Sequence, residues 1–189
     1  MTNKLYDMYS NSPSPHILGD ITLEMTESKP HRIIQIIVRE SEFIAFQKLL
    51  TTIALSLPTA GSIVHAKASS ILLIAPQQYL LIHYSDATLQ TQQFDNELSK
   101  CGLLIDVSGS RYFIKLQGAK ASRLLSRLVP IDFYHQRPKG DFVVDTFCHG
   151  IPLTIWSASS DDKFIFSVPI SYQSAIKSSI EKMAMSLQS

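Results

Sequence analysis

The sequence is poor in cysteine. It contains two cysteines, Cys101 and Cys148, which lie far apart in a chain of 189 residues and form no CxxC pair. A disulfide framework needs several cysteines at close spacing, and a structural zinc site needs Cys or His ligands at regular spacing. The sequence argues against both, and we interpret the two cysteines as reduced, buried thiols.

Long apolar runs are also missing. No stretch approaches the roughly 20 apolar residues that a membrane-spanning helix needs. The N-terminal segment MTNKLYDMYSNSPSPH is polar and lacks the apolar core of a secretory signal. We therefore expect no membrane association and a reducing, cytoplasmic location.

The chain has little net charge, because 17 Lys and Arg residues are balanced by 16 Asp and Glu residues. Its overall electrostatics give no reason to expect nucleic acid or an anionic membrane as a partner. A hydrophobic fraction of 45% is enough for a chain of this length to bury a substantial core. We expect an ordinary globular protein.

Residues 1–30 contain Ser12-Pro13-Ser14-Pro15 and no sustained period, which predicts an extended or partly disordered N-terminal arm. We expect residues 31–189 to form a single compact α+β domain of two closely packed lobes. The apolar patterns of the first lobe predict a strand over 32–39, a helix from 41 to about 57, a hairpin of strands 70–75 and 79–84, a helix from 85 or 86 to about 100 that Gly102 closes, and a strand over 103–107. This β-α-β-β-α-β order is that of a ferredoxin-like lobe.

The second lobe begins after a turn at Ser108-Gly109-Ser110. Its patterns predict a strand over 112–116, a helix between Gly118 and Pro130, three strands over 141–147, 151–156 and 163–168, and a last helix from about 171. The order of this lobe is β-α-β-β-β-α. The predicted fold class is therefore α+β throughout.

The Ser108-Gly109-Ser110 turn invites an active-site interpretation. A catalytic serine needs a positioned base and an oxyanion hole, and the sequence has no G-x-S-x-G elbow here. Gly109 and Gly118 match neither a Walker loop nor a dinucleotide-binding turn. We interpret Ser108 and Ser110 as turn residues.

Other candidate sites are equally weak. Cys148 and His149 are neighbours, but adjacent strand residues point to opposite faces and cannot readily share a proton. The six histidines show no HxH or HExxH spacing, and Asp161-Asp162 falls in a predicted hairpin loop. We assign no catalytic, cofactor-binding or metal-binding residue in this chain.

One local feature is a surplus of positive charge between residues 111 and 139. Asp132 is the single acid in this stretch, against seven basic residues: Arg111, Lys115, Lys120, Arg123, Arg127, Arg137 and Lys139. On the predicted helix, Lys120, Arg123 and Arg127 share a face opposite the leucines. They form either a solvated helix face or a contact for an acidic partner, with Lys120, Arg123, Arg127 and Arg137 as the candidate contact residues.

Several short motifs resemble those of the gamma subunit of heterotetrameric sarcosine oxidase. The first is the run from Ile71 to Ile82, an apolar strand, Pro76, two residues, Tyr79 and Leu-Leu. The later motifs follow in the same order as in that family: Ile105-Asp106-Val107-Ser108, Gly118-Ala119, Leu124-Leu125, Pro130-Ile131-Asp132 and Ser171-Tyr172. The resemblance covers roughly residues 32–185.

This resemblance implies a fold like the folate-binding domain of the glycine-cleavage T-protein. It also implies a non-catalytic subunit that acts in assembly and structural support of an amine-oxidising flavoenzyme. The larger flavoprotein subunits are then the expected partners, and they are expected to carry FAD, FMN, NAD and folate, whereas this chain carries no cofactor.

Two alternatives belong to other functional classes. A stand-alone folate-binding aminomethyl-transfer protein of the T-protein group would carry an acidic pair shortly after Gly-Ile, but Gly150-Ile151-Pro152-Leu153-Thr154 has no carboxylate. The related iron-sulfur-assembly folate proteins carry Lys-Gly-Cys-Tyr, of which Lys139-Gly140 keeps two residues. An RNA-binding module would need aromatic and glycine-rich signatures that the sequence lacks.

Overall fold

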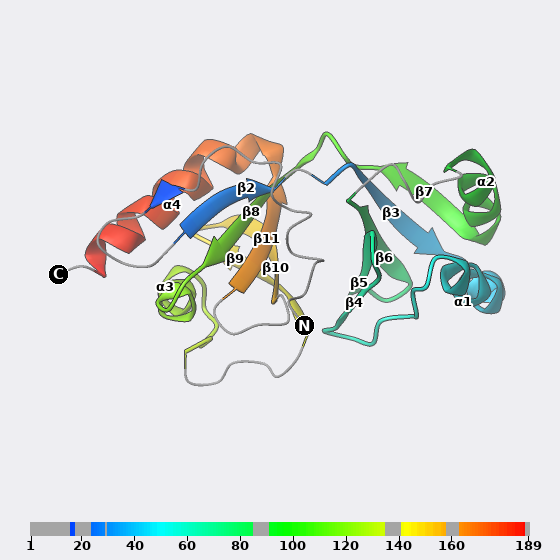
Figure 1. Cartoon of the computed structure of the whole chain (residues 1–189), viewed down its shortest axis with the longest axis horizontal. Helices are drawn as coiled ribbons and strands as arrows, with labels where there is room; N and C mark the ends of the chain where they lie inside the picture. Colours follow the sequence, from blue (N-terminus) through cyan, green and yellow to red (C-terminus); the bar gives the residue numbers. More distant parts are fainter. Residues whose placement is uncertain are drawn as a thin grey trace. The chain divides into compact units, whose positions relative to one another are not determined.

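The computed structural model describes residues 16–17, 24–28, 30–84, 91–134, 141–157 and 163–187. These residues form a mixed α+β fold with two antiparallel sheets (Figure 1), and the chain divides into two compact units. The first unit includes Pro30–Gly109. The second includes Ser110–Ser189 together with β1 (His16–Ile17) and β2 (Glu24–Ser28). The predicted α+β class is confirmed.

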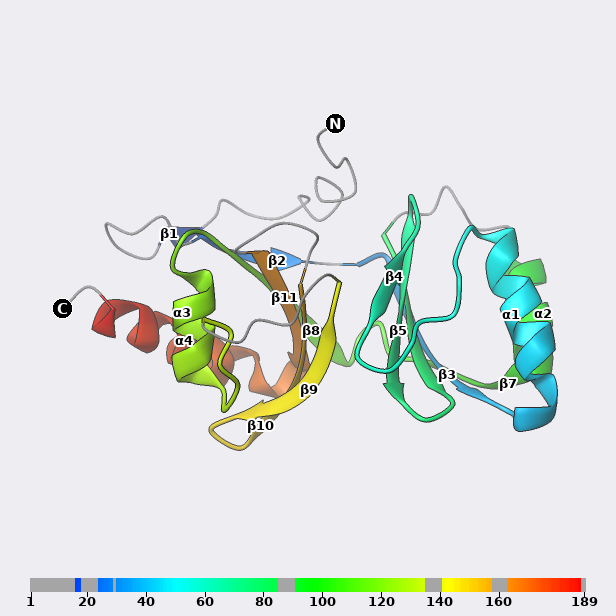
Figure 2. The ribbon, with the colours of Figure 1, turned by 90° about the horizontal axis from the view of Figure 1, so that it is seen from below.

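Within the described residues, the first unit has a five-stranded sheet in the order β4-β5-β6-β3-β7. Helices α1 and α2 cover one face of this sheet (Figures 1 and 2). The elements are β3 (Arg32–Val38), the short 3-10 helix η2 (Glu40–Glu42), α1 (Phe43–Thr52), β4 (Ile63–His65), β5 (Ser69–Ala75), β6 (Gln78–His83), α2 (Thr91–Cys101) and β7 (Gly102–Asp106). Apart from η2 and the short β4, this is the order that the sequence predicts. Residues 85–90, where we predicted the start of the second helix, lie outside the described residues.

The core of the first unit lies between its helices and its sheet. The sequence RIIQIIV makes β3 a strand because β-branched side chains pack well on a pleated surface. Its alternate residues Ile34, Ile36 and Val38 belong to the same buried cluster as Phe46 and Leu50 of α1. This alternation fixes which face of the sheet the helices cover.

Helix α1 is shorter than predicted. It ends at Thr52, whereas the apolar pattern continues to Leu57. Ala54 adopts a φ of 58°, its N–H donates to the carbonyl of Thr51, and the N–H of Leu55 donates to the carbonyl of Leu50. This is a Schellman termination with alanine in the position that glycine usually takes, so the sequence gives no signal of it.

Gly102 has a different role from the helix cap that we predicted. It is the first residue of β7 and pairs with Val38 of β3 directly after α2 ends. A Cβ atom on Gly102 would overlap the carbonyl oxygen of Ile37. Glycine is therefore required by the close approach of two backbones.

The second unit contains a six-stranded sheet, counted over the described residues, in the order β1-β2-β8-β11-β10-β9. Helices α3 and α4 lie on one face of it (Figure 2). Its further elements are β8 (Arg111–Gln117), α3 (Ala121–Leu128), β9 (Val143–Cys148), β10 (Ile151–Ser157), β11 (Lys163–Pro169), the 3-10 helix η4 (Ile170–Tyr172) and α4 (Gln173–Ser186). Predicted and observed ends of the predicted strands in this unit differ by at most two residues.

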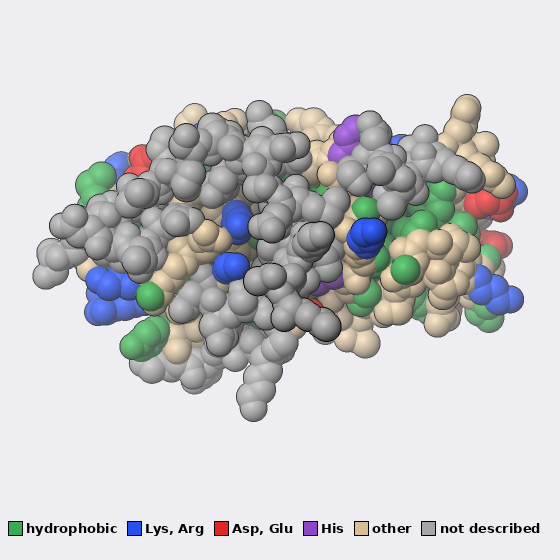
Figure 3. All heavy atoms as spheres, in the orientation of Figure 1, with side chains coloured by type: hydrophobic (Ala, Val, Ile, Leu, Met, Phe, Trp, Pro, Cys, Tyr) green, Lys and Arg blue, Asp and Glu red, His purple; other side chains and the backbone are tan. Residues whose placement is uncertain are grey.

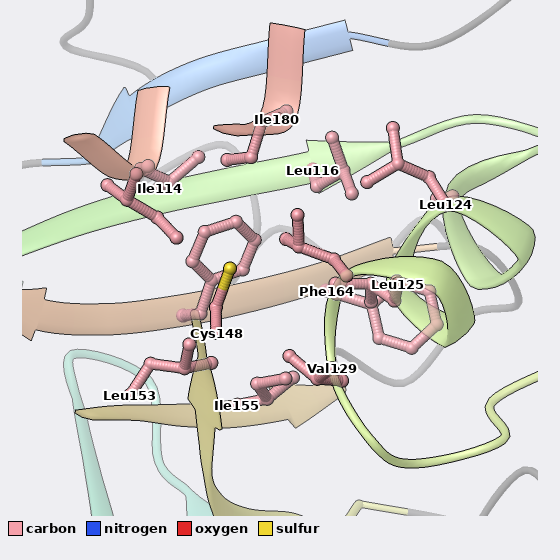
Figure 4. Packing of buried hydrophobic residues seen from close by; sticks show 14 of the residues in the cluster. Ile114, Leu116, Leu124, Leu125, Val129, Cys148, Leu153, Ile155, Phe164 and Ile180 are labelled. Atoms are coloured by element: carbon pink, nitrogen blue, oxygen red, sulfur yellow. The ribbon is translucent and has the colours of Figure 1, made fainter. Parts of the chain in front are cut away.

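A second hydrophobic core lies between this sheet and its two helices (Figure 4). Leu124 and Leu125 of α3 point into it, together with Ile180 of α4, and all three are fully buried. From the sheet, Ile114 and Phe164 meet them. Burial of each such side chain stabilises the fold by about 1.5–3 kcal/mol, which holds both helices in place.

The predicted N-terminal arm contributes a strand that we did not predict. Strand β2 pairs antiparallel with β8 from Glu24↔Gln117 to Ser28↔Phe113. Met25 is buried in the second core. The segment EMTES has one apolar residue and thus no alternating pattern, so its pairing depends mainly on the edge that β8 offers.

We predict that Gly102→Ala destabilises the protein, because the added Cβ forces β7 away from β3. The expected loss is about 1–3 kcal/mol of unfolding free energy. Gly109→Ala is the matched control, since no atom lies within 4 Å of a Cβ built there, and its effect should stay within about 0.5 kcal/mol. Urea denaturation followed by circular dichroism measures both. Equal denaturation midpoints for the two variants would contradict the close approach of the β3 and β7 backbones.

Candidate functional site

Helix α3 presents the basic residues that the sequence singles out. Arg123 and Arg127 lie one turn apart on its exposed side, because Leu124 and Leu128 turn the other side into the core. Lys120 is the N-cap residue and is half-buried, so it lies before the helix. Arg137 lies outside the described residues. The structure thus brings two of the four candidate residues together.

The two arginines line an open pocket of about 710 Å³ that the sequence analysis missed. The rest of the described lining comes from Ser126 and from the segment after the helix: Val129, Pro130, Ile131, Asp132 and Tyr134. Part of this segment is the Pro130-Ile131-Asp132 motif noted in the sequence. The pocket combines positive charge with an apolar floor.

Hydrogen bonds and a buried ring fix the shape of this segment. The N–H of Tyr134 donates to Ser126 Oγ at 2.9 Å and to Asp132 Oδ1 at 3.1 Å. Phe133 is buried, stacks on Phe142 at 5.6 Å between ring centroids, and meets Phe164 edge-on. The wall of the pocket is therefore preformed rather than shaped by what enters it.

The two arginines differ in what they already contact. Arg127 lies in the last turn of α3, where positive charge interacts favourably with the helix dipole, and its Nη1 donates to the carbonyl of Ser186 at the end of α4 at 3.5 Å. Arg123 and Lys120 make no side-chain hydrogen bond or ion pair with any other described residue. Arg127 thus has a structural role, and Arg123 is available to a partner.

Ser108 is a turn residue, as predicted. Its Oγ donates to Asp106 Oδ1 at 2.6 Å and accepts the N–H of Ile33 at 2.9 Å. Hydrogen bonds from the side chain and the backbone of Ser108 are the main causes that lower the pKa of Asp106. The hydrogen bond and the charge of Arg32 lower it further. Ser110 completes the turn, and its carbonyl accepts the N–H of Ile170. The serine, the carboxylate and the arginine close this turn rather than form a nucleophile.

Cys148 and His149 do not form a catalytic pair. Cys148 is fully buried in the second core (Figure 4), and burial raises the pKa of its thiol, which opposes formation of a reactive thiolate. His149 is exposed in the turn between β9 and β10, with a φ of 48°. The structure thus places one of the two side chains in the core and the other in an exposed turn.

A buried Ser–His pair escaped the sequence analysis. Ser69 Oγ lies 2.8 Å from His83 Nδ1 across the β5–β6 hairpin, with 3% and 0% of these residues exposed. Burial lowers the pKa of His83 to about 4, and the charge of Arg32 contributes in the same direction. A histidine this acidic is a weak base at neutral pH, and a buried serine is not accessible to a substrate. We interpret the pair as structural.

One carboxylate also lies where the sequence showed none. Thr154, in the Gly-Ile segment without acids, donates its Oγ1 proton to Asp145 Oδ1 at 2.6 Å. Asp145 comes from β9, the neighbouring strand, and pairs with Thr154 in the register of the sheet. A linear motif cannot detect a group that the adjacent strand supplies.

Neither a metal-binding cluster nor a membrane-spanning helix is found among the described residues. Among them, no group of three or more His, Cys, Asp or Glu side chains is placed to hold a metal ion. No helix in the same part of the chain has the length and apolar character needed to span a membrane. The Asp161-Asp162 loop lies outside these residues.

Solved structures identify the fold as one shared by two enzymes of known activity. A chain of the heterotetrameric sarcosine oxidase from Corynebacterium sp. U-96 matches with a TM-score of 0.76 and 17% identity, over 98% of this chain and 93% of that chain. The glycine cleavage system aminomethyltransferase T from Bartonella henselae matches with a TM-score of 0.57 and 14% identity, over 85% of this chain and 45% of that chain. No protein-family model and no curated protein matches. The fold relationship implied by the sequence motifs is confirmed.

We predict that the protein loses stability as the pH falls from about 6.5 to about 4. His83 has a folded pKa of about 4, so the unfolded state binds its proton first, and the loss amounts to about 3 kcal/mol. His83→Asn should flatten the pH dependence in this window, and His149→Asn, in an exposed turn, is the control. Urea denaturation at a series of pH values gives the result. An unchanged slope in His83→Asn would mean that His83 is not held neutral.

Proposed function

We propose that this chain is a non-catalytic, gamma-type subunit of a heterotetrameric sarcosine oxidase or of a related methylated-amine flavoenzyme. The observation that carries the proposal is the extent of the structural match, 98% of this chain and 93% of the sarcosine oxidase chain. Such a match fits two subunits of similar size better than one domain of a larger enzyme. The matched protein is a heterotetramer, so the chain would act in assembly and structural support of larger subunits.

The internal contacts of the chain support a structural role. Ser108 and Asp106 bond to each other within a turn, His83 bonds to buried Ser69, and Cys148 lies in a core. Each of these groups stabilises the fold through a hydrogen bond or through packing in a core. The surface instead offers the arginine pocket beside α3, which suits contact with a protein.

In the proposed complex, the partner subunits bind FAD, FMN, NAD and folate. The sequence has neither the glycine-rich turn that a dinucleotide needs nor a phosphate loop. We also propose a cytoplasmic location, because both cysteines are free and buried, as expected of a protein from a reducing compartment.

We predict that the isolated chain is colourless, whereas the complex that contains it shows a flavin spectrum. An absorbance spectrum of each purified sample, with protein concentration from amino-acid analysis, is sufficient. A stoichiometric flavin band in the isolated chain would refute the assignment of the flavin to partner subunits.

We further predict that the chain co-elutes with the flavoprotein subunits of the proposed complex when they are co-expressed and separated by size exclusion. Reversing both Arg123 and Arg127 to Glu should slow association by about tenfold and make it less dependent on salt, because charge complementarity acts mainly on the association rate. Lys48→Glu, an exposed charge reversal on α1, is the control. Elution of the wild-type chain alone at every salt concentration would refute the subunit proposal.

A second candidate function is a stand-alone folate-binding protein for one-carbon transfer. It is favoured by the match to the aminomethyltransferase and by Asp145, which supplies a carboxylate beside Thr154. Titration of the isolated chain with tetrahydrofolate, followed by calorimetry, separates the two functions. We predict no saturable binding; binding that Asp145→Asn weakens would establish the alternative.

A further inference from the structure

The pocket beside α3 joins a positively charged surface and an apolar one. Its open side carries the guanidinium groups of Arg123 and Arg127, and Figure 3 shows Lys and Arg side chains where α3 and the end of α4 lie. Its floor is apolar, with Val129 buried and Ile131 half-buried. A ligand for this pocket therefore needs an apolar part and a negative charge.

The charges of the pocket limit how much negative charge it accepts. Two arginines exceed the single carboxylate of Asp132, so the described lining has a net charge of +1. The Asp132 carboxylate accepts the N–H of Tyr134 and is held in the wall. A ligand with one or two carboxylates therefore fits the pocket better than a chain of phosphates, because a lining with a net charge of +1 neutralises little negative charge.

Tyr134 adds an aromatic surface at the rim. Tyr134 is 59% exposed, although the neighbouring Phe133 is buried. The backbone N–H of Tyr134 donates to Ser126 Oγ, which holds Tyr134 in place. An exposed, well-positioned tyrosine beside arginines has the composition of a protein-binding hot spot, because both residue types are enriched there.

We infer that this pocket holds an apolar side chain from an acidic segment of a partner protein, with Arg123 binding a carboxylate next to that side chain. This inference rests on the proposed function, since the partner is a larger subunit of the same complex. Arg123 supplies the binding charge because it has no other bond among the described residues, and Arg127 holds the end of α4 and adds to the positive field. The apolar side chain lies over Ile131 and against Tyr134.

A direct test uses a capped peptide, Ac-Gly-Glu-Glu-Phe-Asp-Glu-Gly-NH2, and the full chain labelled with 15N. Two matched peptides replace either the acids by their amides or the phenylalanine by alanine. Titrations followed by NMR should place the largest shifts at the amides of Tyr134 and Ile131. Each matched peptide should bind about tenfold more weakly, as expected from loss of one charge-assisted contact or one buried side chain.

Variants of the chain identify the residues involved. Arg123→Glu and Tyr134→Ala should each weaken the acidic peptide by about tenfold or more, and Lys182→Glu, an exposed reversal on α4, should leave binding unchanged. Equal binding to Arg123→Glu and the wild-type chain would overturn the inference. So would absence of peptide binding, or self-association of the chain that depends on Arg123, because the occupant would then be a second copy.

The same variants separate this inference from the proposed function. If Arg123→Glu assembles with the flavoprotein subunits like the wild-type chain, the pocket is not the docking site, and the subunit proposal stands. If the acidic peptide binds in the pocket but no flavoprotein subunit co-elutes, the pocket binds acidic segments and the assignment to this complex fails.

Discussion

The packing of α3 on the sheet of the second unit is the contact on which the candidate site depends. Leu124 and Leu125 are fully buried against that sheet, so a rotation of the helix would expose them and cost several kcal/mol. Because the apolar side of α3 faces the core, Arg123 must lie at the surface. Pro130 then ends the helical path, and the segment that follows forms the wall of the pocket. The geometry of the site is thus a consequence of the core.

Three side chains of types often used in catalysis lie in the interior of the two units. Ser69, His83 and Cys148 are buried; burial makes His83 a weaker base and opposes formation of the Cys148 thiolate. The surface around α3 has a different character, with Arg123 unpaired among the described residues and Tyr134 exposed. This distribution supports the structural role that we propose for the chain.

The sequence predicts the strands well where side chains carry the signal, as in β3 and β8, whose apolar residues form short, mostly buried runs. The sequence fails to predict elements whose position depends on backbone conformation or on tertiary contacts. Ala54 ends α1 in a conformation typical of glycine, and β2 pairs with β8 although Met25 is its single apolar residue. The basic helix face was identified, but the pocket was not, because its wall depends on the packing of Phe133 against Phe142 and Phe164, which no linear pattern shows. Likewise, Asp145 meets Thr154 only through the register of two strands.

The pairing of β2 with β8 has a consequence for how the chain folds. Ser28, the last residue of β2, lies opposite Phe113 near the start of β8, so the chain leaves and re-enters the second sheet at neighbouring points. In the chain, the segment Pro30–Gly109 of the first unit therefore connects β2 to β8, as a turn connects the two strands of a β-hairpin. During synthesis the first unit can complete its own core early, whereas β2 must wait for a partner strand that is made only afterwards. Closing so long a loop slows folding, and it makes the joining of β2 to β8 a natural late step in the maturation of the second unit.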